Sequence, residues 1–354
     1  MKIFRSLICL CAVLGLLVVL TGCPNSAHKD EENKEPKGQV NFTVFDTVSY
    51  VYSYAEDPQE EFDARCDAVF EILGEYHNLF DIYYAHSGVN NLKTLNDGAG
   101  GEPIAVDQKL IDFLLYAKEL YTLTGGEMNV MMGSVLSLWH DCREEASNSS
   151  ADARIPTTEA LEEAALHTDI SLLEINTENK TVRITDPDAR IDVGALGKGY
   201  ATEMAAKYLR DNGADGYVLN IGGNIRIIGH KPDGSGWGTG IKNPQNPSQY
   251  ALKLTIANTS CVTSGDYERY FFVNGVKYHH VIDKDTLMPS THFSSVTVLT
   301  PNSGLADALS TALFAMSYED GLALVNRVGD VDVLWITSDG TQYYTPGIAD
   351  MILE

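Results

Sequence analysis

The sequence predicts an α+β fold with largely antiparallel or mixed sheets and packed helices, in a single domain of two closely packed lobes. Predicted helices and strands come in uneven clusters rather than in strict alternation, which argues against a doubly wound parallel sheet. Strand-like segments follow one another between residues 217 and 299. Residues 39–354 exceed the usual size of one compact unit, so one large domain or two lobes would fit.

The first 22 residues have the pattern of a lipoprotein signal peptide. Lys2 and Arg5 precede an apolar run from Leu7 to Leu20, and small residues lead to Cys23. The alternative is a single transmembrane anchor, which usually needs about 20 apolar residues. We expect cleavage just before Cys23, lipid on that cysteine, and a protein exported and anchored to the cell membrane on its periplasmic or extracytoplasmic face.

Residues 23–38 are polar and charged and lack apolar periodicity, which indicates a flexible tether before a domain at 39–354. The net charge of −24 excludes nucleic acid as a partner. A phosphate-bearing small molecule could bind only where a cation or local lysines reverse the field. Beyond Cys23, the isolated Cys66, Cys142 and Cys261 form neither a disulfide framework nor a zinc spacing, so we expect buried thiols.

The first half of the domain is expected to open with a strand from Asn41 to Tyr54, where β-branched and aromatic residues nearly alternate. A helix starts near Asp57, and a second helix has Asp107 as its cap. The segment from Cys142 to Thr157 is rich in polar residues and indicates a surface loop. The expected buried stripes are Phe62, Cys66, Val69, Phe70, Leu73 and Phe80 on the first helix, and Leu110, Phe113, Leu114, Ala117 and Leu120 on the second.

The second half is expected to be mostly β, with a helix from Lys198 to Arg210 and closing helices at Leu305–Met316 and Tyr318–Val328. No internal repeat is present. The predicted strands are Leu172–Ile175, Thr181–Ile184, Tyr217–Ile221, Ile225–Ile228, Trp237–Ile241, Leu252–Ala257, Tyr270–Val273, Tyr278–Ile282, Ser295–Leu299, Val331–Thr337 and Gln342–Thr345.

The motif IDVGALGKGYA, residues Ile191–Ala201, places three glycines and Lys198 between a strand and a helix. Such a turn can present backbone amides and a helix N-terminus to a phosphate. It is not a Walker loop, because Gly199 follows Lys198 where Ser or Thr is needed. The spacing alone is equally compatible with a tight structural turn.

The motif DALSTALF, residues Asp307–Phe314, lies on an otherwise apolar predicted helix. Asp307 and Thr311 stand four residues apart, so their oxygens emerge on one helix face. Carboxylate and hydroxyl oxygens suit a hard cation such as Mg²⁺. The alternative is that Asp307 caps or hydrogen-bonds its own helix.

Two further segments contain candidate site residues. Residues Val262–Ser290 contain a predicted hairpin turning at Asn274 and Gly275, with His279, His280 and Asp283 on or after its second strand. A histidine near an aspartate can act as a base, but adjacent histidines point to opposite faces, so at most one can serve a given cleft. In LNIGGNIRIIG, residues Leu219–Gly229, the paired glycines indicate a bulge or a close approach.

In order, IDVGALGKGYA, LNIGGNIRIIG, TSGDYERYF, YHHVID and DALSTA resemble the successive motifs of the ApbE family, the FAD:protein FMN transferases. The resemblance runs from about Val44 to the C-terminus. It implies an enzyme that binds FAD and Mg²⁺, cleaves the FAD diphosphate, attaches FMN through a phosphoester bond to Thr or Ser of a partner protein, and releases AMP. It also implies Mg²⁺ ligands from the carbonyl of Ala195, from Asp307 and Thr311, and from the carbonyl of Ser310.

The same resemblance implies FAD contacts from Asp192, Lys198, Ser264 and His280, with Lys198, His280 and Asp283 in the catalytic set; His280 is preferred over Asp283 as the base. In LFDIYYAHSG, Tyr83 is similar to the aromatic residue that covers the flavin, with Tyr84 as the rival. Glu127, Met128 and Asn129 match a segment that lines the cofactor cleft. The chain departs from the family pattern at residues 45–47, where it has Phe45, Asp46 and Thr47, and at 128–131. Phe45 is nevertheless expected among the cofactor-binding residues.

The expected acceptor is an exported flavoprotein subunit with a Thr or Ser flavinylation site. Two alternatives stay open at the level of sequence. One is Mg²⁺-dependent hydrolysis of FAD to FMN and AMP, and the other is a non-enzymatic flavin-binding lipoprotein.

Overall fold

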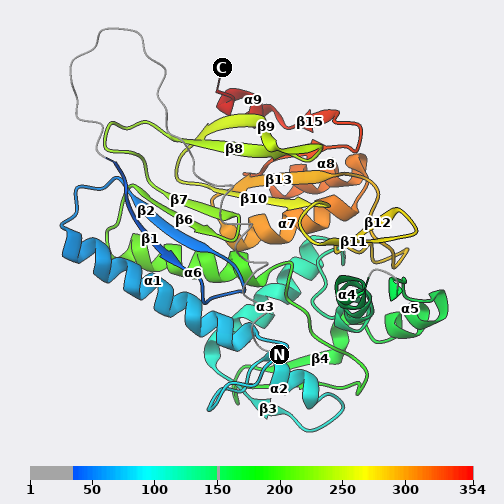
Figure 1. The fold of residues 1–354 in the computed structure, drawn as a ribbon. Helices are drawn as coiled ribbons and strands as arrows, with labels where there is room; N and C mark the ends of the chain where they lie inside the picture. Colours follow the sequence, from blue (N-terminus) through cyan, green and yellow to red (C-terminus); the bar gives the residue numbers. More distant parts are fainter. Residues whose placement is uncertain (1–34, 150–151, 354) are drawn as a thin grey trace.

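The structure, a computed structural model, describes residues 35–149 and 152–353 (Figure 1). The predicted signal peptide, Cys23 and most of the predicted tether lie outside the described residues. In the part that is described, no helix combines the length and apolarity that crossing a bilayer requires.

An eight-stranded sheet forms the centre of the molecule, and every neighbouring pair of its strands is antiparallel. The predicted α+β class with antiparallel sheets is therefore confirmed. The strands, in spatial order, are β1 (Lys37–Asn41), β2 (Ser49–Ser53), β6 (Tyr217–Ile221), β7 (Asn224–Ile228), β10 (Ser260–Gly265), β13 (Ser295–Thr300), β14 (Asp332–Ile336) and β15 (Gln342–Tyr344).

Helices cover one face of this sheet, and a two-stranded ribbon covers the other (Figure 1). On the helical face, α6 (Gly197–Asp211) packs between α1 (Gln59–Phe80) and α7 (Ser303–Ala315), while α8 (Tyr318–Val328) adds to the core beneath β13 and β14. The ribbon of β8 (Trp237–Asn243) and β9 (Asn246–Ile256) closes the second core with α9 (Pro346–Met351).

A smaller lobe packs around its own apolar cluster beside the end of α7 (Figure 1). It contains α4 (Gly133–Asn148), α5 (Thr158–Ala165) and the hairpin of β11 (Tyr270–Val273) and β12 (Val276–His279). The turn residues Asn274 and Gly275 both have positive φ, as the predicted hairpin requires. The remaining elements are α3 (Gln108–Leu123), α2 (Leu92–Asp97) and a three-stranded sheet of β3 (Ile104–Ala105), β5 (Thr181–Ile184) and β4 (Leu173–Asn176), with α2, β3 and β4 at the bottom of Figure 1.

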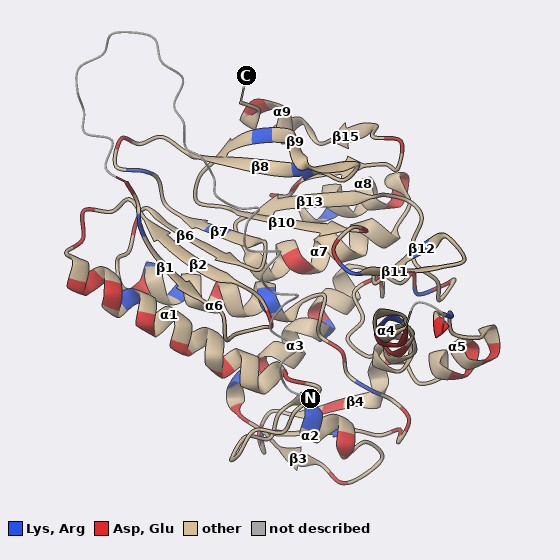
Figure 2. Cartoon of the chain, in the orientation of Figure 1, with Lys and Arg blue, Asp and Glu red and all other residues tan. Residues whose placement is uncertain are grey.

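The helices predicted from apolar spacing form where expected. Every predicted stripe residue of α1 is buried except Phe70, which is half-buried, and the whole stripe of α3 is buried. Asp107 caps α3 by accepting a hydrogen bond from the Lys109 amide at 2.8 Å. Figure 2 shows acidic residues along α1, which agrees with the negative net charge of the whole chain.

Three sequence predictions are corrected. The strand expected over 41–54 is two strands, β1 and β2, because Phe45 and Asp46 have positive φ and break the extended chain. Since β1 begins at Lys37, the folded part starts within the range expected to be tether. The loop expected over 142–157 is helical to Asn148, because Cys142 is buried in the cluster of the small lobe. Cys66, Cys142 and Cys261 are free, buried thiols, as predicted.

Candidate active site

The candidate site is centred where α6 crosses α7. Gly199 on α6 donates its amide to Oδ2 of Asp307 on α7, at 2.8 Å. A Cβ at position 199 would overlap both the Asp307 side chain and the carbonyl oxygen of Ser303. The glycine in the predicted phosphate motif is thus needed for close packing of the two helices, and this packing brings the first two motifs together.

Asp307 is a buried carboxyl, with only 7% of its surface exposed. Burial raises its pKa, while the charge of Lys198, the Gly199 amide and the Asn224 side chain act in the opposite direction. A buried carboxylate needs compensating positive charge, and a cation bound here would add to the compensation that Lys198 supplies. Asp307 does not cap its own helix, because its carboxylate accepts the amide of Gly199 on α6, whereas Asn302 caps α7.

Three hydroxyl groups cluster one turn further along α7, where those of Ser310 and Thr311 lie within hydrogen-bond distance of the backbone oxygen of Asp307. Ser264 on β10 contacts the Ser310 hydroxyl at 2.8 Å and the Thr311 hydroxyl at 3.3 Å. Ser310 is fully buried and donates to the backbone oxygen of Asp307 at 2.9 Å, so its side chain links α7 to the sheet. Oxygen donors of this kind fit Mg²⁺ and offer nothing to a soft metal.

A network of buried polar side chains lies beside Asp307. Ser303 donates its hydroxyl to Oδ1 of Asn224 at 2.8 Å, and its amide to Oε2 of Glu203 at 2.9 Å. Glu203 in turn pairs with Arg226, and both are buried. With Oδ1 bound to Ser303, the buried amide nitrogen of Asn224 has no hydrogen-bond partner in the described part of the chain, and the Asn224 side chain lowers the pKa of nearby Asp307. The sequence singled out the glycines of LNIGGNIRIIG but not this asparagine.

Asp192 lies in a strap that leads into α6. Its amide donates to the carbonyl of Val130 at 2.9 Å, and its Oδ1 accepts from the Gly194 amide at 2.8 Å. Asn96 binds both the amide and the carbonyl of neighbouring Ile191, which fixes the strap from its other side. The predicted turn of Asp192, Ala195 and Lys198 is therefore held rigidly at the N-terminus of α6.

The two adjacent histidines have different roles, as their alternation predicts. His279 is buried, binds the carbonyl of Ser290 through Nε2 at 2.8 Å, and packs edge-on against Phe314. His280 has a buried Nδ1 with no hydrogen-bond partner in the described part of the chain. Burial and the charges of Arg269, His279, Arg143 and Lys198 lower the pKa of His280 to about 3, so it is neutral near pH 7.

Asp283, the other predicted base, organises the loop after β12. Its Oδ1 accepts hydrogen bonds from the amides of Asp285 and Thr286, both at 2.8 Å. Its backbone also binds Leu287 and Met288. These contacts account for an aspartate at this position without a role in proton transfer, so the geometry favours His280 as the base.

Tyr83 faces the site, whereas Tyr84 is more exposed. Asp81 presents both residues by accepting their amides at 2.7 and 2.9 Å. The Tyr83 ring lies 5.5 Å from the ring of His140 on α4. Burial of part of the Tyr83 ring and the charge of Asp192 raise its pKa. Tyr84 is 70% exposed. The structure thus associates Tyr83, and not Tyr84, with the other predicted site residues.

Phe45 lies at the tip between β1 and β2. Its amide donates to Nδ1 of His77 at 3.2 Å, and its ring meets the His77 ring edge-on. His77 contacts His86, which is paired with Asp81 at 2.9 Å. Phe45 is connected in this way to the loop that carries Tyr83.

The segment of Glu127, Met128 and Asn129 uses its side chains for contacts within the protein. The Met128 side chain is buried in the main core, and Asn129 binds the carbonyl of Thr168 at 2.8 Å and the Met131 amide at 2.9 Å. Glu127 pairs with Lys284 at 3.3 Å; burial raises the pKa of Glu127 against the charge of that lysine. These side chains are occupied by the protein, and the next residue, Val130, holds Asp192.

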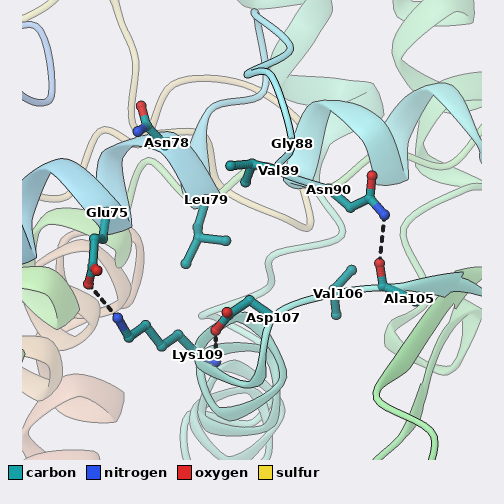
Figure 3. A pocket seen from close by; sticks show the side chains of 10 residues that line it. All are labelled: Glu75, Asn78, Leu79, Gly88, Val89, Asn90, Ala105, Val106, Asp107 and Lys109. Carbon is teal, nitrogen blue, oxygen red and sulfur yellow. Dashed lines mark hydrogen bonds and ion pairs between the residues drawn. The ribbon is translucent and has the colours of Figure 1, made fainter.

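A separate pocket of about 420 Å³ lies between the C-terminal half of α1 and the start of α3 (Figure 3). An ion pair of Glu75 with Lys109 borders it, and Asn90 binds the carbonyl of Ala105 at 2.8 Å. None of its lining residues is a predicted site residue. Since these polar groups are already paired, the pocket does not compete with the site at α6 and α7.

Comparisons with known proteins agree with this geometry. The sequence profile of the ApbE family matches residues 41–335. A protein of Treponema pallidum named FAD:protein FMN transferase is 29% identical over 96% of this chain and 94% of its own length. A protein of the same name from Vibrio cholerae is 29% identical over 94% of this chain and 95% of its own length.

Solved structures are similar over nearly the whole described chain. The ApbE protein of Thermotoga maritima superposes with a TM-score of 0.79 at 26% identity, over 90% of this chain and all of that structure. The flavin transferase ApbE of Vibrio cholerae gives a TM-score of 0.73, also at 26% identity, with the same coverage.

Proposed function

The chain belongs to the ApbE family, and from that membership we propose that it is an FAD:protein FMN transferase. The observation that carries the proposal is the contact of Gly199 with Asp307, which brings the neighbouring Lys198 to that carboxyl, together with the unpartnered Nδ1 of His280. Lys198 links the two groups, because its charge lowers the pKa of both the Asp307 carboxyl and the His280 imidazole. This arrangement suits transfer of a phosphoryl group.

The reaction proceeds by displacement at phosphorus. The hydroxyl oxygen of a Thr or Ser in the acceptor forms a bond to the phosphorus of the FMN half, and the bond from that phosphorus to the bridging oxygen breaks. AMP leaves with the bridging oxygen and its electron pair. His280, neutral and with an unpartnered Nδ1, accepts the proton of the attacking hydroxyl.

Mg²⁺ is the metal that the oxygen donors fit. Asp307, Thr311 and the carbonyl of Ala195 would hold it, with Ser310 and Ser264 fixing the helix turn behind. When bound, the ion neutralises charge on the diphosphate and stabilises the charge that develops during transfer. Lys198 supplies a second positive charge from the start of α6.

The flavin is positioned by aromatic and polar residues on the opposite side. Tyr83 covers the ring system, and its contact with His140 sets the orientation of the phenol ring. Asp192 lies near Tyr83, where its charge already acts on the phenol. Phe45 supports this side through His77 and His86 rather than by direct contact with the reacting atoms.

We also propose that the protein is lipid-anchored through Cys23 after removal of residues 1–22. This expectation rests on the sequence pattern at the N-terminus. The acceptor is then an exported flavoprotein subunit, since enzyme and acceptor must meet on the same side of the membrane. A Cys23→Ala variant should lose incorporated lipid and partition away from the membrane fraction; unchanged fractionation would contradict the anchor.

The function is tested by incubating the full chain with FAD, Mg²⁺ and a flavoprotein domain that carries a Thr or Ser acceptor. A fluorescent band that survives denaturing electrophoresis, with one AMP released for each label, is the expected result. AMP and FMN release without any label would indicate FAD hydrolysis. Intact FAD after long incubation would indicate a flavin-binding protein.

A further inference from the structure

Two arginines without a predicted role lie on the His280 side of the site: Arg143 stands outside the motifs, and Arg269 falls within TSGDYERYF. In the β11–β12 hairpin, Tyr270 pairs with His279 and Phe271 pairs with Tyr278. Arg269 and His280 lie immediately beyond these strand ends, where the strand alternation puts them on the side that carries Phe271 and Tyr278. That face packs on Trp139 of α4, with ring centroids 6.4 Å and 5.9 Å apart.

Arg143 approaches from the opposite element. It stands one helical turn after Trp139 on α4, so it projects from the same face of that helix toward the hairpin. Its Nη2 lies 2.7 Å from Nδ1 of His140, whose Nε2 is 3.3 Å from Glu144. This contact fixes the direction of the guanidinium without neutralising it, because the atom that accepts is a ring nitrogen.

The charges on this side are close enough to act on one another. Both guanidinium groups lower the pKa of His280 and oppose the rise in the pKa of Tyr83. Burial and the charge of Arg269 lower the pKa of Arg143 itself. Asp192 and Glu144 are the acidic groups that face the cluster. Within residues 35–149 and 152–353, neither arginine forms an ion pair with a carboxylate.

Two guanidinium groups without carboxylate partners repel each other, and an anionic ligand would stabilise them. The chain has a net charge of −24, so the unpaired cations are concentrated against the overall field. Guanidinium groups bind phosphate oxygens in pairs, with a fixed geometry that an ammonium group lacks. The neutral His280, whose Nδ1 has no partner in the described part of the chain, marks where the reacting group belongs.

We propose that Arg143 and Arg269 form an anion subsite that binds the phosphate next to the flavin, on the side of the diphosphate that faces His280. The inference rests on the proposed function for the identity of the anion. The arginines are positioning residues: they orient the phosphorus toward the acceptor hydroxyl, while Asp307 and Lys198 act on the opposite side. A second consequence is that binding of the anion offsets the positive field on His280 and makes its imidazole a stronger base.

The test compares two flavins that differ in phosphate content. Binding of FAD and of riboflavin to the full chain is measured by ultrafiltration in Mg²⁺, for the wild type and for Arg143→Gln, Arg269→Gln and the double variant. Each single change should weaken FAD binding about 10-fold, because a charge-assisted hydrogen bond is lost, and should leave riboflavin binding within about 2-fold. Arg143→Lys should recover only part of the loss.

Arg154→Gln is the matched control, since it removes the same charge from an exposed arginine paired with Glu145 on α4. This variant should change the binding of neither FAD nor riboflavin. Equal weakening of FAD and riboflavin in the Arg143 and Arg269 variants would mean that the arginines only maintain the fold, and unchanged FAD binding would remove the subsite. Either result overturns the inference.

The outcome is separable from that of the proposed function. If wild-type protein binds FAD with the expected arginine dependence but labels no acceptor, the transferase proposal fails and the subsite stands. If transfer occurs and both arginine variants bind FAD normally, the subsite fails and the transferase proposal stands.

Discussion

The two sides of the candidate site are built in different ways. Around Asp307, short side chains and backbone groups are fixed by buried hydrogen bonds between α6, α7 and β10. Around His280, long or aromatic side chains meet from α4, the β11–β12 hairpin and the loop after α1. The first side belongs to the main core and the second to a small satellite core.

This difference suggests that the two sides have different functions, metal binding on the first and binding of the flavin and the acceptor on the second. A rigid oxygen cage suits a metal whose coordination must be held within tenths of an ångström. A side built from half-exposed side chains can admit a bulky flavin and then a protein acceptor. Damage to the rigid side should abolish the chemistry, while damage to the other side, apart from His280 itself, should show first in binding.

The largest effect is expected at the rigid side. Asp307→Ala should lower the rate of FMN transfer roughly 10²-fold or more, because it removes the carboxylate that would hold the metal. The circular dichroism spectrum should stay unchanged. A variant with normal turnover at saturating Mg²⁺ would mean that the carboxyl does not bind the metal.

His280→Asn should lower the transfer rate about 10²-fold, the usual contribution of a general base. FAD affinity should change little, since asparagine retains a polar group of similar size. The matched control is His279→Asn, whose site is a structural hydrogen bond to Ser290; that variant should lose thermal stability before it loses catalysis. Equal turnover of His280→Asn and wild type would assign the proton to another group.

Gly199→Ala tests the close packing of the rigid side. The added methyl group would overlap Asp307 and Ser303, so we expect a loss of about 1–3 kcal/mol in the free energy of unfolding and weaker Mg²⁺ binding. Gly74→Ala on α1 is the control, because a Cβ there meets nothing within 4 Å; it should stabilise slightly through helix propensity. Urea titration of both variants gives the comparison.

The pH dependence of stability tests the charged surroundings of His280. Its pKa of about 3 lies below the ordinary 6.5, so the unfolded chain binds a proton that the folded chain refuses. The resulting stability is complete above pH 6.5 and falls by about 1.4 kcal/mol for each unit below it, down to about pH 3. Between pH 7 and pH 5, wild type should lose about 1–2 kcal/mol more than His280→Asn in urea titrations. Equal losses would mean that Arg269, His279, Arg143 and Lys198 do not act on a buried imidazole.

The smallest effect distinguishes the two tyrosines. Tyr83→Ala should weaken FAD binding by up to about 10-fold, the value of one aromatic contact. Tyr84→Ala should leave the affinity unchanged, since the ring is mostly exposed. Fluorescence titration measures both, and the reverse order of the two effects would exchange their assignments.

Much of the main core could be predicted from the sequence, because α1 and α3 place apolar residues at helical spacing over several turns. Strand β10 was missed because its residues, SCVTSG, are small and polar, although it lies in the middle of the sheet. No helix is predicted where α4 lies, and the polar residues after Cys142 indicate a loop; burial of Cys142 keeps these last turns helical.

The site residues, too, could be predicted only in part from the sequence. Asp307 and Thr311 could be grouped, because both lie on one helix face, and Gly199 could be flagged by its motif. Arg143 and Arg269 could not be paired, since 126 positions separate them and only the packing of α4 on the hairpin brings them together. Asn224 carries no signal of its own; its role depends on Ser303 fixing which end of the amide faces Asp307.

A crystal structure with FAD and Mn²⁺, located by its anomalous signal as a substitute for Mg²⁺, tests the central claim most directly. The account predicts a peak bound by Asp307, Thr311 and the carbonyl of Ala195, with the diphosphate between that ion and His280. A diphosphate bound elsewhere, or an ion with no contact to Asp307, would contradict it.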